Sequence, residues 1–78
     1  MNAEKIRAAV EKAAKTKQKM AMFYFQVLIH ADEIRKEDDL VQFSKEILPD
    51  HSKPSTGIKQ MLRLDEVIKE QGYVLKKA

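Results

Sequence analysis

One stretch limits what this chain can fold into more than any other. Met20–Ala31 reads MAMFYFQVLIHA, and ten of its twelve residues are apolar; the exceptions are Gln26 and His30. A helix that is apolar nearly all round has to be enclosed by other parts of the protein. The stretch is also well short of the roughly 20 residues that cross a bilayer. We therefore predict that it is the central core helix of a compact domain.

Apolar residues upstream continue the same helical pattern. With Lys17 filling one gap, they recur in alternating steps of four and three at Ile6, Val10, Ala13, Met20, Tyr24, Val27 and Ala31. Such a heptad pattern predicts one continuous helix from about Ala3 to Ala31, and a break within Lys15–Lys19 is the alternative.

The first part of this pattern is a narrow, alanine-rich stripe that needs a surface to pack on. It either crosses the chain's own helices or meets the same segment of a second chain, and we favour the second arrangement. The sequence thus predicts a homodimer, or a complex with a helical partner protein. The interface would consist of Ile6, Val10, Ala13 and Lys17.

Two shorter helices are expected downstream. Asp38 or Asp39 can cap the first, and Pro49 ends it. Pro54 suits the first turn of the second, and Gly72 suits its end. We predict an all-α fold in which a long N-terminal helix carries two shorter helices in a helix-turn-helix-like arrangement. Residues 1–78 would form one domain, with a compact core at 20–75 and a projecting or dimerising arm at 1–19.

The last helix has a polar side in its N-terminal half. In a helix-turn-helix reader, the second short helix lies in the major groove and its first side chains reach base edges and phosphates. Arginine and lysine suit guanine or phosphate, glutamine suits adenine, and hydroxyl groups bond either. The predicted nucleic-acid-binding residues are Ser55, Thr56, Lys59, Gln60 and Arg63. An ordinary solvated helix face is the competing interpretation.

The run KPSTGIKQMLRLDEVIKEQGYV resembles the third helix, with its following Gly-Tyr-Val, of many helix-turn-helix and winged-helix domains. The whole chain is similar to small bacterial and phage proteins described as helix-turn-helix-like. The resemblance covers roughly Glu37–Val74. It implies a DNA-binding or transcription-regulatory module, with double-stranded DNA as its partner.

Charge is unevenly distributed along the chain. Residues 1–30 carry six basic and two acidic side chains. Residues 31–50 carry three basic and seven acidic side chains, and residues 51–78 carry six basic and three acidic ones. The net charge of +3 is modest for a nucleic-acid binder. The two basic ends are nevertheless compatible with a polyanion footprint.

Other kinds of site have weaker support. Lys15, Lys17 and Lys19 next to Phe23–Phe25 suggest a stacking platform for single-stranded nucleic acid, but adjacent aromatic residues on a helix point in different directions, which favours core packing. His30, Asp32 and Glu33 are too few to predict a metal site. No nucleophile with a base, paired carboxylates or phosphate-binding glycine loop is evident. We therefore expect no enzyme activity, no cofactor and no small-molecule substrate.

The location is inferred from the N-terminal segment and from the cysteine content. The chain has no cysteine, which excludes disulfides. Its first residues are too polar and too often interrupted by charge for a secretory signal, so a cytoplasmic location is expected. Residues 2–19 are amphipathic, but an apolar face made mostly of alanine is too small for strong membrane binding.

Overall fold

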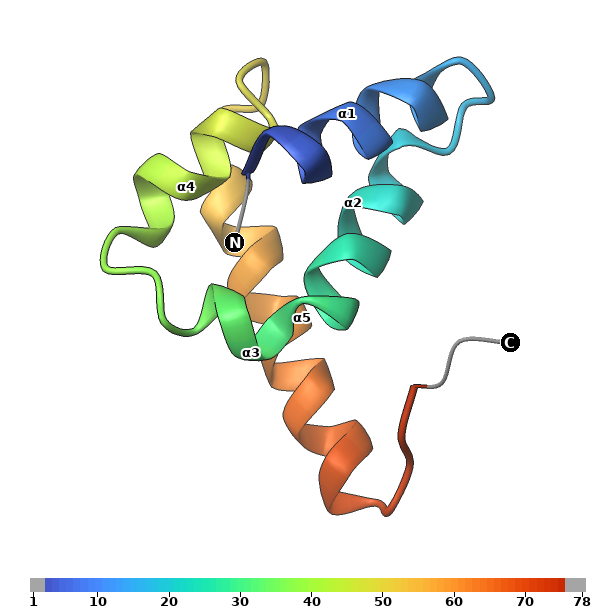
Figure 1. The fold of residues 1–78 in the computed structure, drawn as a ribbon, viewed down its shortest axis with the longest axis vertical. Helices are drawn as coiled ribbons and strands as arrows, with labels where there is room; N and C mark the ends of the chain where they lie inside the picture. The colour runs from blue at the N-terminus through green and yellow to red at the C-terminus, as the bar shows by residue number, and fades with distance from the viewer. Residues whose placement is uncertain (1–2, 76–78) are drawn as a thin grey trace.

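The computed structural model describes residues 3–75, and these form five α-helices with no strand (Figure 1). The helices are α1 (Ala3–Ala14), α2 (Lys19–Ile29), α3 (Ala31–Ile34), α4 (Leu40–Ile47) and α5 (Pro54–Glu70). The prediction of an all-α fold is confirmed. The terminal lysines Lys76 and Lys77, which add to the basic C-terminal end, lie outside the described residues.

The long N-terminal helix is not continuous, so our first prediction for this segment was wrong and the alternative break is confirmed. Lys17 has a left-handed backbone with φ of 63°. The amide of Gln18 donates to the carbonyl of Ala13 at 3.1 Å, and the amide of Lys17 donates to that of Ala14 at 3.2 Å. These two bonds form a Schellman motif, which ends α1 and reverses the chain. The heptad pattern concealed this turn because its left-handed position holds lysine instead of glycine.

The helices enclose a core in a closed arrangement of four. α1 packs against α2 and α4, and α5 packs against the same two helices. In the view of Figure 1, α4 and α2 lie on either side of α5, and α1 spans from one to the other. The buried core cluster consists of Ile6, Val10, Phe23, Val27, Ile34, Phe43, Ile47, Leu48 and Ile58. Every helix contributes to it, so the short α3 is part of the same packing unit.

α2 is central, but it is enclosed on only one side. Phe23 and Val27 are completely buried, whereas Phe25 and Ile29 remain 49% and 45% exposed. The expectation that this apolar helix would be covered all round is therefore wrong. α1, α3 and α5 pack against α2 and cover its inner face, but part of its outer face is left open.

α2 and α5 approach closely at Gly57. A Cβ atom at this position would lie 3.0 Å from Cε2 of Phe23 and 3.2 Å from Cε1 of Tyr24. Carbon atoms in contact normally lie about 3.5–4.0 Å apart, so the glycine provides the space for the two rings. This contact fixes the N-terminal half of α5 against the core helix.

The start of α4 and both ends of α5 follow the sequence signals closely. The side chain of Asp39 accepts a hydrogen bond from the amide of Gln42 at 3.0 Å and so caps α4. Pro54 begins α5, as predicted. Gly72, with φ of 85°, ends it through a second Schellman motif. Local signals therefore set the direction in which α5 leaves the core.

Candidate functional site

Four of the predicted DNA-binding residues form one exposed strip on α5. Thr56, Lys59, Gln60 and Arg63 are all exposed, and their helical spacing places them on one face over about 10 Å. Ser55 is half-buried and is turned about 100° from Thr56, so it lies on the flank of the strip. We call the four exposed residues the α5 strip.

The cations of the α5 strip are unpaired. Among residues 3–75, no hydrogen bond or ion pair involves the side chain of Lys59 or Arg63. Residues 51–64 contain no acidic side chain. The strip begins at Thr56, in the first turn of α5, where the helix dipole adds positive potential. Both charges are therefore available to a partner.

The connection that precedes α5 differs from a tight helix-turn-helix turn. Residues 48–53 separate α4 from α5, whereas the usual turn has about three or four residues. α4 and α5 nevertheless pack directly against each other. No strand follows α5 among the described residues, so the part of the chain up to Leu75 contains no wing.

The predicted interface residues do not form an exposed surface. Ile6 and Val10 are 1% and 0% exposed, and Ala13 is also buried. Lys17 is exposed, but it lies in the turn after α1. Of the two arrangements considered for this stripe, the structure has the one in which it crosses the chain's own helices. The three buried residues pack within their own chain, so the interface expected from these four residues is not present as an accessible surface.

The other sequence candidates do not assemble into sites. Phe23 is buried, Tyr24 half-buried and Phe25 exposed, so the three rings do not form one stacking surface. Across residues 3–75 there is no group of three or more histidine, cysteine, aspartate or glutamate side chains placed to hold a metal ion. Asp32, one of the candidate ligands, instead accepts a hydrogen bond from Lys69 at 2.9 Å.

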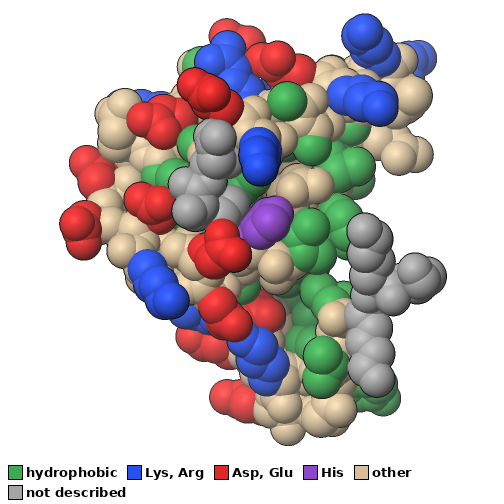
Figure 2. Space-filling model, viewed as in Figure 1, with side chains coloured by type: hydrophobic (Ala, Val, Ile, Leu, Met, Phe, Trp, Pro, Cys, Tyr) green, Lys and Arg blue, Asp and Glu red, His purple; other side chains and the backbone are tan. Residues whose placement is uncertain are grey.

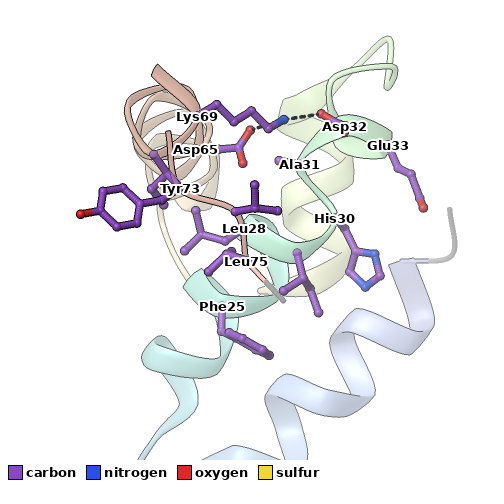
Figure 3. Close-up of a pocket in the computed structure, with 13 residues that line it drawn as sticks. Phe25, Leu28, His30, Ala31, Asp32, Glu33, Asp65, Lys69, Tyr73 and Leu75 are labelled. Carbon is purple, nitrogen blue, oxygen red and sulfur yellow. Dashed lines mark hydrogen bonds and ion pairs between the residues drawn. The ribbon is translucent and has the colours of Figure 1, made fainter. Parts of the chain in front are cut away.

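An apolar groove, which the sequence analysis did not predict, runs beside α2. Its volume is about 690 Å³, and Phe25, Leu28 and Ile29 form its α2 wall. Ile68 and residues 73–75 line it from the opposite side. Figure 2 shows hydrophobic side chains gathered along this hollowed flank, and Figure 3 shows Phe25, Leu28 and Leu75 within the groove. The sequence features that could have predicted this groove were the apolar outer face of α2 and the apolar run Tyr73, Val74 and Leu75.

A cluster of ion pairs closes one end of this groove (Figure 3). The side chain of Asp65 is 8% exposed; its Oδ2 lies 2.8 Å from Nη1 of Arg35 and 3.1 Å from Nζ of Lys69. Nη2 of Arg35 also donates to the carbonyl of Leu62 at 2.8 Å. Arg35 therefore fastens the end of α3 to the middle of α5.

The pKa of Asp65 reflects two opposing effects. Burial raises the pKa, but the hydrogen bonds and positive charges of Arg35 and Lys69 outweigh it, so the pKa lies below its ordinary value. The carboxylate thus stays ionised and holds both cations. The burial of Asp65 was not predicted from the sequence. The i, i+4 spacing of Asp65 and Lys69 was the only local signal.

Comparison with protein-family models, curated proteins and solved structures finds no match to this chain. In residues 3–75, none of the helices combines the length and the apolar character needed to span a membrane. A function for this chain therefore has to be inferred from the chemistry of the α5 strip and of the groove beside α2.

Proposed function

We propose that this protein is a DNA-binding module, with a transcription-regulatory role, and that the N-terminal half of α5 contacts the duplex. The observation that carries the proposal is the α5 strip, whose Lys59 and Arg63 are exposed and unpaired. In contrast, Arg35 and Lys69 are held by the carboxylate of Asp65. Cations without internal partners are the ones that can neutralise phosphates at least cost.

The side chains of the strip have a consistent division of roles. Lys59 and Arg63 lie one helical turn apart, so both can reach phosphates or guanine edges along one groove. Gln60 lies between them and carries the amide that suits adenine. Thr56, nearest the helix start, offers a hydroxyl group to a phosphate.

Fluorescence anisotropy with a labelled mixed-sequence duplex tests the proposal. The variant Lys59→Ala/Arg63→Ala should weaken binding roughly tenfold at low salt. It should also reduce the slope of log K against log salt by about 2, since each lost phosphate contact removes about 0.9. Alanine suits helix interiors, and both positions are exposed, so the fold should persist.

A matched control separates this effect from a general loss of positive charge. Lys5 and Lys12 are exposed on α1. The variant Lys5→Ala/Lys12→Ala has the same net charge as the test variant; it should lose less affinity and keep the salt slope, because its lost charges make no phosphate contact. Equal weakening by both variants would show only non-specific attraction, and absence of binding by the unaltered protein at low salt would overturn the proposal.

A further inference from the structure

The outward face of α2 is apolar over its whole length. Ala21, Phe25 and Ile29 are exposed and follow one another at intervals of four residues, so they lie along one ridge of the helix. No charged side chain occurs from Met20 to Ile29. Figure 2 shows hydrophobic surface on this flank. We call Ala21, Phe25 and Ile29 the α2 ridge.

The α2 ridge is symmetric in a way that suits a second copy of itself. Ala21 lies four residues before Phe25, and Ile29 lies four residues after it. If two α2 helices pair antiparallel about a two-fold axis at Phe25, each Ala21 meets the Ile29 of the other copy. A small residue then faces a large one at both ends, and the two rings meet at the centre. Such self-complementarity is what a two-fold interface requires.

Charges beyond the two ends of α2 favour the same orientation. The turn before α2 carries Lys15 and Lys17, whereas α3, directly after it, carries the exposed Glu33; Asp32 is already paired with Lys69 and Arg35 of its own chain. Antiparallel pairing brings Lys15 and Lys17 of each copy toward Glu33 of the other. Parallel pairing would place like charges together, which is unfavourable. The charge pattern thus selects an antiparallel second copy as the occupant.

From these observations we infer that two copies of this chain associate through antiparallel contact of their α2 ridges, with the groove beside α2 widening the apolar contact. The interface differs from a dimer through the α1 stripe, whose side chains are buried within one chain. It also does not depend on DNA, so the dimer forms in the absence of nucleic acid.

Sedimentation equilibrium provides the first test. The unaltered protein should approach twice the chain mass of 9.0 kDa as its concentration rises. Phe25→Asp should raise the dissociation constant at least about tenfold, because it places a carboxylate at the centre of the contact. The matched control is Val41→Asp, since Val41 on α4 is 47% exposed, close to the 49% of Phe25. The control should dimerise like the unaltered protein, and circular dichroism should show that both variants remain helical.

Cysteine cross-linking tests the orientation, because the chain has no cysteine of its own. A mixture of the Ala21→Cys and Ile29→Cys variants should form the mixed disulfide under mild oxidation. Each variant alone should not, because its two cysteines would be separated by about 12 Å along the helix axes. Disulfides need Cα atoms within about 7 Å.

The results divide cleanly. Concentration-dependent dimerisation that Phe25→Asp weakens, with preferential mixed cross-linking, supports the inference. A protein that stays monomeric at millimolar concentration overturns it, as does equal weakening by Phe25→Asp and Val41→Asp. Efficient cross-linking of each cysteine variant with itself would indicate parallel helices and would also overturn it.

Discussion

Replacing Gly57 with alanine should destabilise the protein, although the same change stabilises most helices. At an exposed helix position, alanine is favoured over glycine by about 1 kcal/mol. At Gly57 the added methyl group would lie 3.0 Å from Cε2 of Phe23. Reaching an ordinary contact distance requires the ring to shift by a few tenths of an ångström. Phe23 is completely buried, so its ring cannot move without disturbing the core.

The size of the effect follows from these two contributions. Overpacking of a well-packed core costs about 1–3 kcal/mol. After the gain in helix propensity is subtracted, Gly57→Ala should lower the free energy of unfolding by about 1 kcal/mol. For a chain of this size that corresponds to a fall of about 4–8 °C in Tm. Urea denaturation and thermal melts followed by circular dichroism measure both quantities.

Two further variants separate the helix-propensity effect from the steric contact at Gly57. Ala8→Gly, at an exposed position in α1, reports the propensity difference alone and should cost about 1 kcal/mol. Phe23→Leu removes the ring that the added methyl group would contact. In that variant Gly57→Ala should become neutral or stabilising, and a double-mutant cycle measures the difference. If Gly57→Ala stabilises the unaltered protein by its full propensity gain, the contact between α2 and α5 is looser than described.

Three other changes have defined outcomes. Asp39→Ala removes the acceptor of the Gln42 amide and should cost about 1 kcal/mol in urea denaturation. Lys17→Gly should raise stability by up to about 1 kcal/mol in thermal melts, because glycine relieves the strain of the left-handed backbone at φ 63° and this gain exceeds its larger entropy cost on folding. The lowered pKa of Asp65 means that its ionised form adds stability above the ordinary carboxyl pKa of 3.8. That contribution is lost as pH falls through the lowered pKa. Urea denaturation at constant ionic strength measures the free energy of unfolding of the unaltered protein and of Asp65→Asn. The difference between the two values should shrink below pH 3.8.

The elements with strong local signals were predictable from the sequence. Asp39, Pro54 and Gly72 mark helix ends by capping and backbone preferences, which neighbouring residues determine. The polar strip on α5 was also predictable, because its exposure follows from helical spacing once the inner face is known. The buried Ile58 and the half-buried Met61 and Leu62, about one turn further on, form that inner face.

Other features depended on long-range packing. The break after α1 uses lysine at a left-handed position, and only the backbone reveals this. The stripe at Ile6 and Val10 fits equally well against a second chain or against α2 and α4, and periodicity does not distinguish them. The burial of Asp65 depends on Arg35, which lies 30 residues earlier in the chain. Such pairing is absent from any local pattern.

The ion cluster has a consequence for the last turns of α5. The buried residues of this helix are Pro54, Ile58 and Asp65, so beyond Asp65 it has no fully buried side chain. Lys69 holds this part of the helix to Asp32 through a contact that is open to solvent. Dissolved electrolyte shields such contacts but hardly weakens apolar packing. At high salt concentration the end of α5 should therefore loosen while the four-helix core stays intact. The position of the groove wall that α5 forms would then depend on ionic strength.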